Sequence, residues 1–334
     1  MKKEIGISFL IPSFNPPVGA FCKLLKTLLA CTENVSMEII IGDDSDNGFS
    51  FEKLKGSAGD LIWNKVKFIK FPRMGLPKKR ALLMGMANFE YFEFLDCDDS
   101  LAPIDFEKVF NIVTTNDFDL VEFPIFVRKK TEIKKRGCAH VNRRDYLNDL
   151  LFSNSCNSLW SKIYKKKVFE DAFERRHVSL PDLMLGDDKV LNIVLASCVR
   201  TIGYIDTPFY IYEQNSTSIS KTIDIVSRFK DTEKAYLFYE TQFSLFKGSL
   251  DGFCENFSKR CKTDFCDVIL STIPKTGLFQ KKVLLAAFCC ETTLKRIFPS
   301  FWKSSVANIP WYKKIFISFY RRFVHVVCQR HNKA

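Results

Sequence analysis

Three aspartates lie within four residues at Asp96-Cys97-Asp98-Asp99, directly after the apolar run Phe92–Leu95. Carboxylates this close repel one another unless a cation lies among them. Oxygen ligands at a strand end suit Mg²⁺ or Mn²⁺, which bind a few carboxylates and complete their coordination with phosphate and water. The motif predicts a divalent-metal site with Asp98 and Asp96 as ligands, and the alternative is a solvated turn that caps the next helix.

The sequence contains two more groups of acidic residues, one after an apolar run and one after a glycine. Asp43-Asp44-Ser45 comes after the apolar run Met37–Ile41, where a carboxylate can accept hydrogen bonds from a base or a ribose. Asp187-Asp188 follows Gly186 and opens an apolar-rich helical pattern. A carboxylate at a helix start either caps the helix or acts as a general base, and both interpretations stay open from the residues alone.

A basic group, Lys78-Lys79-Arg80, lies between Gly75 and a helical pattern. Side chains of this kind can meet a diphosphate, although a solvated helix start would have the same composition.

The elements that must position these groups alternate between strands and helices, which predicts a mostly parallel sheet with helices on both faces. In such sheets ligands bind beyond the carboxyl ends of the strands, where the acidic groups lie. Strands are expected at residues 5–11, 37–41, 66–71, 91–95, 119–126 and 201–204, and helices at 18–29 and 78–88.

The order of these segments resembles glycosyltransferase family 2, an inverting family with a GT-A fold. Seven motifs of that family occur in order over residues 5–221. The chain departs from the family pattern at Lys79, Ala81, Asp187 and Glu213. The matching segments are Pro12-Ser13-Phe14-Asn15, Asp43-Asp44-Ser45, Gly75 with Arg80, Asp96–Asp99, Trp160–Tyr164 with Phe169, Asp187-Asp188, and Tyr210–Glu213 with Ser218–Ser220.

The resemblance implies a role for each acidic group. Asp43 would contact the uracil, Asp96 the ribose, and Asp98 the metal, Mn²⁺ or Mg²⁺, that bridges the donor diphosphate. Asp188 would be the general base, with Asp187 orienting or helping it. Further nucleotide contacts are assigned to Pro12, Ser13, Phe14, Asn15, Asp44, Ser45, Gly75, Arg80 and Cys97.

The implied reaction moves a sugar from a nucleotide sugar, a UDP-hexose, to a hydroxyl of a glycan or glycolipid in bacterial surface polysaccharide or lipooligosaccharide synthesis. One base and one displacement imply inversion, and the departing diphosphate needs a metal to neutralise its charge. The resemblance specifies neither the sugar, the acceptor nor the linkage. The alternatives are a metal-dependent nucleotidyltransferase, disfavoured because no glycine occurs between the first strand and Gly19, and an inactive nucleotide-sugar or membrane-binding protein.

Composition divides the chain into a catalytic domain and a basic tail. Of the net charge of +12, residues 277–334 carry +10, which argues against a nucleic-acid partner for the chain as a whole. We expect a GT-A domain over residues 1–222, with a nucleotide-sugar half to about 125 and an acceptor half from 126, and a helical accessory region over 223–334. The twelve cysteines form no CxxC pair and predict reduced thiols in the cytoplasm.

The segment Trp311–Cys328 has an apolar arc opposite a basic arc when it is drawn as a helix. Arg321 and Arg322 near its centre make spanning a bilayer costly, whereas lying on an anionic surface avoids that cost. The segment therefore predicts peripheral attachment to the inner face of the cytoplasmic membrane, or else a helix packed on the catalytic domain.

Overall fold

The computed structural model describes residues 5–46, 51–58, 60–129, 132–136, 139–140, 142–152, 157–174, 178–184 and 186–214, with six single positions between 227 and 241. The chain divides into two compact units, and the described residues from 5 to 214 lie in the first. Apart from those six positions, the predicted accessory region lies outside the described residues, and so does all of its segment 311–328. Within the described part, no helix is both long enough and apolar enough to cross a bilayer.

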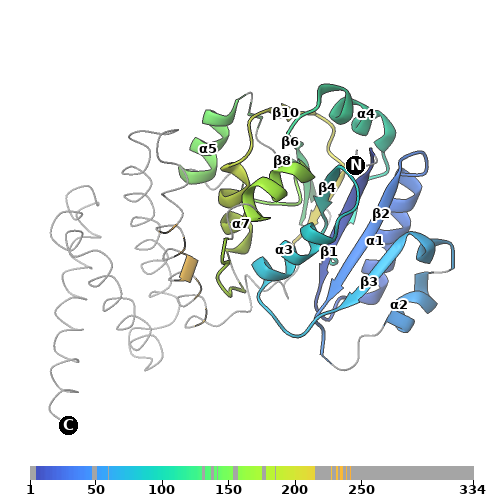
Figure 1. Ribbon diagram of the computed structural model, residues 1–334. Helices are drawn as coiled ribbons and strands as arrows, with labels where there is room; N and C mark the ends of the chain where they lie inside the picture. The colour runs from blue at the N-terminus through green and yellow to red at the C-terminus, as the bar shows by residue number, and fades with distance from the viewer. Residues whose placement is uncertain are drawn as a thin grey trace, which may run out of the picture. The chain divides into compact units, whose positions relative to one another are not determined.

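A seven-stranded sheet forms the centre of this unit (Figure 1). All neighbouring strands are parallel except at one strand, β9, which is antiparallel to both of its neighbours. The predicted mostly parallel sheet is therefore confirmed. In spatial order the strands are β10 (Ile202–Tyr204), β6 (Leu120–Glu122), β9 (Lys162–Lys165), β4 (Tyr91–Phe94), β1 (Ile7–Ser13), β2 (Met37–Asp43) and β3 (Val66–Lys70).

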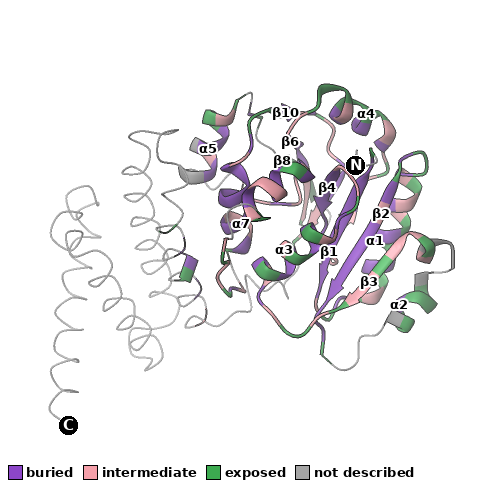
Figure 2. Ribbon diagram, in the orientation of Figure 1, coloured by how far each residue is buried: buried purple, intermediate pink, exposed green. Residues whose placement is uncertain are grey.

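Helices cover both faces because the central strands are apolar on both sides. Helices α1 (Val18–Cys31) and α4 (Phe106–Asn116) share one core cluster with Ile39 and Ile41 of β2. On the other face, helix α3 (Leu76–Met86) brings Leu83 against Gly42 and contacts α7 (Asp187–Ala196). Figure 2 shows β1 and β2 buried along their length and the outer turns of the helices exposed. The remaining helices are α2 (Phe51–Ala58), η1 (Asp60–Lys65), α5 (Arg143–Phe152), α6 (Lys166–Phe169) and the π-helical η2 (Glu170–Glu174).

The predicted strand over residues 119–126 is wrong as one element, because the structure divides it between two sheets. Strand β6 ends at Glu122, and the backbone N–H of Phe123 still donates to the carbonyl of Ser161 at 3.2 Å. Pro124 has no N–H to donate, so the ladder stops there and the chain enters a second sheet. That four-stranded sheet has the order β5 (Ser100–Leu101), β11 (Tyr210–Glu213), β7 (Ile125–Lys129) and β8 (Glu132–Arg136).

Strand register aligns the ends of β1, β2 and β3. Ser13 pairs with Asp43, and Asp43 pairs with Lys70. Since the three strands are parallel, their last residues form a row at the carboxyl edge of the sheet, which is the edge at which the sequence predicted a ligand site.

Glu93 is a buried carboxylic acid inside β4. It is 0% exposed, its neighbours in register are Phe9 and Ile163, and neither carboxyl oxygen has a hydrogen-bond partner among the described residues. Burial raises the pKa of Glu93 well above its ordinary value. The folded protein therefore keeps a proton that the unfolded chain releases above about pH 4.3, and the cost of this residue grows as pH rises.

We expect the substitution Glu93→Met to raise the free energy of unfolding by about 1–3 kcal/mol, because it removes a buried polar group without a partner. The gain should be larger at pH 8 than at pH 5. Urea denaturation of both proteins at the two pH values measures it, and a loss of stability in the variant would show that the carboxyl has a stabilising partner.

Candidate functional site

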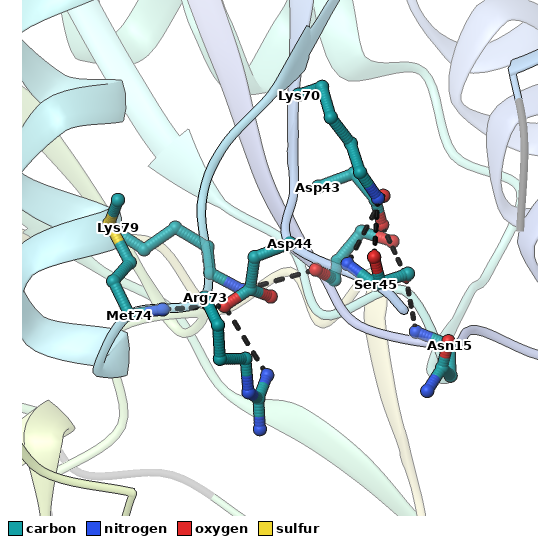
Figure 3. Close-up of polar contacts among 9 residues, drawn as sticks. Asn15, Asp43, Asp44, Ser45, Lys70, Arg73, Met74 and Lys79 are labelled. Carbon is teal, nitrogen blue, oxygen red and sulfur yellow. Dashed lines mark hydrogen bonds and ion pairs between the residues drawn. The ribbon is translucent and has the colours of Figure 1, made fainter. Parts of the chain in front are cut away.

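Asp43 lies at the end of β2, where neighbouring side chains bind its carboxylate through hydrogen bonds and an ion pair (Figure 3). One carboxylate oxygen accepts from the Ser45 hydroxyl at 2.6 Å, and the other accepts from Lys70 Nζ at 2.7 Å. Asn15, in a left-handed conformation with φ 45°, donates its backbone N–H to Ser45 Oγ at 2.6 Å. Asp43 is 0% exposed, whereas the Lys70 side chain is 52% exposed. A ligand at this strand end therefore meets Lys70 first.

Asp44 points the other way and is bound by three donors. Lys79 from α3 forms an ion pair with one carboxylate oxygen, while Arg73 Nη1 and the backbone N–H of Met74 reach the other at 3.3 and 3.2 Å. Lys79 also donates to the carbonyl of Ser13 at 3.1 Å. These contacts tie the ends of β1 and β2 to the loop that precedes α3 (Figure 3).

The loop after β1 carries a half-buried aromatic ring. The Arg73 guanidinium lies 3.6 Å from the ring centroid of Phe14, so Arg73 bridges this ring and Asp44. The Ser13 hydroxyl is buried without a hydrogen-bond partner among the described residues. Pro12 is buried beside Gly42 in the sheet and supports the loop rather than facing a ligand.

The three aspartates after β4 differ in their burial and in their partners. Asp99 is buried and accepts from the Tyr210 hydroxyl and from the backbone N–H of Glu213 at 2.8 Å, which binds the turn to β11. Burial raises the pKa of Asp99 to about 8, as does the Asp96 carboxylate. Burial also raises the pKa of the Cys97 thiol, as do the carboxylates of Asp98 and Asp96.

Asp98 is the one aspartate of this group that makes no hydrogen bond or ion pair within the described residues, although it is half-buried. A carboxylate in that position fits a metal ligand, since a cation would supply the missing partner. Asp96, in contrast, is already paired with Arg80 at 2.9 Å. No three His, Cys, Asp or Glu side chains cluster as potential ligands in the described part, so phosphate oxygens and water would complete the coordination of a metal held by Asp98.

The acidic pair that opens α7 reaches the same place. Gly186 precedes the helix with φ 80°, a left-handed conformation that favours glycine. Arg80 forms ion pairs with both Asp187 and Asp188, which links α7 to Asp96 and the end of β4. The structure therefore brings together two groups that are far apart in sequence.

The pKa of Asp188 is raised to about 7, because burial and the carboxylates of Asp187 and Asp96, which raise it, outweigh the charges of Arg80 and Lys162, which lower it. The Asp188 side chain is 26% exposed, more than the 11% of Asp187. Asp188 thus combines access to a substrate with a pKa suited to accepting a proton near neutral pH.

Comparison with known proteins identifies the first half of the chain. Residues 8–173 match the family model described as Glycosyl transferase family 2. Residues 8–173 form a family 2 glycosyltransferase domain. A comparison with curated protein sequences gave no match.

Solved structures share the fold of this chain. The 1–349 fragment of S. aureus TarS in complex with UDP-GlcNAc is 14% identical with a TM-score of 0.59, and 87% of this chain and 81% of that one are covered. The same fragment in complex with UDP is 15% identical with a TM-score of 0.56, covering 87% and 79%. At this identity the likeness establishes the GT-A-like fold.

Gly75, which was assigned to the nucleotide, serves close packing in the family 2 domain. A side chain at this position would come within 2.8 Å of the backbone nitrogen of Leu183, and Leu76 donates to the carbonyl of Leu183 at 3.0 Å. Glycine is therefore required where α3 begins against the segment that leads to α7.

Sequence reasoning missed the cations that hold the acidic groups. Lys70 and Arg73 flank the exposed Pro72 at the end of β3, so the same strand-end rule would have identified them. Of the predicted basic group, Lys78 is exposed while Lys79 and Arg80 are buried and turn to different carboxylates.

Asp98→Asn is expected to abolish the Mn²⁺-dependent part of UDP binding and to leave the fold intact, because the carboxylate has no structural partner to lose. Calorimetry with UDP, with and without Mn²⁺, measures this. Asp105→Asn, at the exposed N-cap of α4, is the matched control and should bind as the wild type does. Unchanged Mn²⁺-dependent binding in Asp98→Asn would remove this residue from the metal site.

Proposed function

We propose that this protein is an inverting glycosyltransferase that moves a sugar from a UDP-hexose to a hydroxyl of a glycan or glycolipid, with Mn²⁺ or Mg²⁺ as cofactor. The observation that carries the proposal is that carboxylates from the turn after β4 and from α7 meet at Arg80, at the ligand edge of a family 2 domain. Asp98 has no partner there among the described residues and would take the cation, and Asp188, which pairs with Arg80 and is 26% exposed, would take the proton.

Asp98 and Asp188 would act on opposite sides of the transferred sugar, Asp98 on the departing diphosphate and Asp188 on the acceptor hydroxyl. Asp98 would hold the metal, which would neutralise charge on the departing diphosphate. Asp188 accepts the proton of the acceptor hydroxyl as that oxygen attacks the anomeric carbon on the face opposite the diphosphate. A single displacement with one base inverts the anomeric centre. The half-buried ring of Phe14 and the cations Lys70 and Arg73 lie at the end where the nucleoside would bind.

A uridine nucleotide is the favoured donor class because two structures of the same fold were solved with UDP-GlcNAc and with UDP. The resemblance of the motifs to family 2 supports the same class, and it also supports a role in bacterial surface polysaccharide or lipooligosaccharide synthesis.

A thermal-shift screen of nucleotide sugars with and without Mn²⁺ tests the proposed function. A ligand present at 100 times its dissociation constant adds about 2.7 kcal/mol to the stability of a protein that binds it only when folded. We expect a UDP-sugar with Mn²⁺ to raise the melting temperature. The phosphate of the same sugar, which lacks the uridine nucleotide, should leave the melting temperature unchanged. No shift with any nucleotide sugar would contradict the proposal.

The basic segment 311–328 is proposed to hold the enzyme on the anionic inner face of the cytoplasmic membrane, near a lipid-linked acceptor. Each basic residue near an anionic surface gains about 1 kcal/mol, and this gain falls with salt. We expect the full chain to co-sediment with anionic vesicles at low salt, and the substitution of Lys313, Lys314, Arg321 and Arg322 by Gln to abolish that binding. Equal sedimentation of both proteins would exclude the segment as an electrostatic anchor.

A further inference from the structure

Arg80 is the point at which three carboxylates converge. Its Nη2 lies 2.9 Å from Asp96, its Nε lies 3.3 Å from Asp187, and its Nη1 forms an ion pair with Asp188. The guanidinium also lies 5.4 Å from the ring centroid of Phe94 in β4. Each nitrogen of one planar group therefore lies beside a different carboxylate, and the group is held against an aromatic ring on the sheet. The contact between Nε and Asp187 is an ion pair without a hydrogen bond.

The exposures show which groups a substrate can reach. The Arg80 side chain is 5% exposed, whereas those of Asp96 and Asp188 are 27% and 26% exposed. The guanidinium lies beneath the carboxylates, and the carboxylates face the open site. A diphosphate in the site would thus meet carboxylates, or a cation bound to them, before it met Arg80. This burial argues against the direct nucleotide contact that the family pattern assigns to Arg80.

The convergence also couples two sides of the proposed reaction. Asp96 belongs to the turn on the donor side and follows β4, while Asp188 is the second residue of α7 and lies 108 residues from Arg80. Without a cation between them, these carboxylates would repel one another and separate. The charge of Arg80 lowers the pKa of all three carboxylates, which burial raises.

We propose that Arg80 is a positioning residue that fixes Asp188, the base of the proposed function on which this inference rests, at a set place relative to Asp96 and the donor. This role depends on the three nitrogens of the guanidinium, each of which lies beside one of the three carboxylates. A lysine would keep the charge, but its three donors leave a single nitrogen, whereas the three carboxylates here lie beside three separate nitrogens of a planar group. The role is to hold the base, not to bind the nucleotide.

The test compares Arg80→Met and Arg80→Lys with the wild type in UDP-sugar hydrolysis, where water replaces the acceptor, and in UDP binding by calorimetry. We expect kcat to fall about 10²-fold in Arg80→Met and about 10-fold in Arg80→Lys, with the dissociation constant of Mn²⁺-UDP within about threefold of wild type in both. The matched control is Lys165→Met, which removes a cation with two ion pairs, to Glu90 and Asp117, at the amino end of β4. That control should keep the kcat of the wild type.

Several outcomes would overturn the inference. A tenfold or larger loss of UDP affinity with little change in kcat would make Arg80 a nucleotide ligand. Wild-type kcat in Arg80→Lys would show that the three-way fork is not needed, and this variant decides the matter if Arg80→Met does not fold. Absence of hydrolysis by the wild type itself would instead contradict the proposed function, so the two failures are distinguishable.

Discussion

Asp188→Asn is expected to lower sugar transfer by about 10²-fold or more and to leave the affinity for UDP near that of the wild type. The amide has the same shape and can still accept a hydrogen bond from Arg80, but it cannot take a proton from the acceptor hydroxyl. Because the pKa of Asp188 is raised to about 7, wild-type activity should increase as pH rises through that value, when the base loses its proton. The residual activity of Asp188→Asn should lack this rise.

Asp187→Asn is the control that distinguishes the base from its neighbour. Asp187 is more buried than Asp188 and pairs with the same arginine through Nε at 3.3 Å, so its loss should change turnover less. If Asp187→Asn is inactive and Asp188→Asn transfers normally, then the base lies one residue earlier. Normal transfer by both variants would remove the base from α7 altogether.

Asp44→Asn is expected to lower the free energy of unfolding by about 3–5 kcal/mol, because it leaves the Lys79 ammonium buried without a charged partner. The side chains of Asp44 and Lys79 are 0% and 1% exposed, so water cannot replace the lost partner. Burial already lowers the pKa of Lys79, and Asp44 opposes that shift. Urea denaturation of the full chain, followed by tryptophan fluorescence, measures the loss.

Two further variants show that the effect comes from the buried charge. Glu132→Gln breaks an ion pair whose partners, Glu132 and Lys134, are 61% and 72% exposed, and it should cost about 0–1 kcal/mol. Combining Asp44→Asn with Lys79→Met removes both buried charges and should recover part of the stability. A single Asp44→Asn variant as stable as the wild type would mean that this pair does not hold β2 to α3.

The central strands and the place of the site could be predicted because their signals are local. The apolar run Met37–Ile41 must be buried, and the acidic residues that follow it lie at the carboxyl edge of a parallel sheet. The division of residues 119–126 was missed, even though Pro124 marks the point where the ladder has to stop. The second sheet joins β5, β7, β8 and β11 by pairings whose register no local pattern specifies.

The partners of the buried cations could not be predicted from sequence. Neighbouring residues of a helix point about 100° apart, so Lys79 and Arg80 face different carboxylates, and only the packing of α3 decides which. Asp188, one of the two carboxylates that Arg80 meets on α7, is 108 residues away. The burial of Glu93 could not be predicted for another reason. A single acid in an apolar strand suggests a position that faces solvent, whereas here both faces of the sheet are covered.

The anomeric configuration of the sugar released from a UDP-α-hexose tests the central claim most directly. Incubation of the full chain with UDP-N-acetylglucosamine or another UDP-hexose and Mn²⁺, followed by proton NMR during the first turnovers, reads the configuration before the sugar mutarotates. A single displacement that uses Asp188 as base predicts release of UDP together with the β-anomer. Release of the α-anomer, or no release of UDP from any UDP-hexose, would contradict an inverting glycosyltransferase.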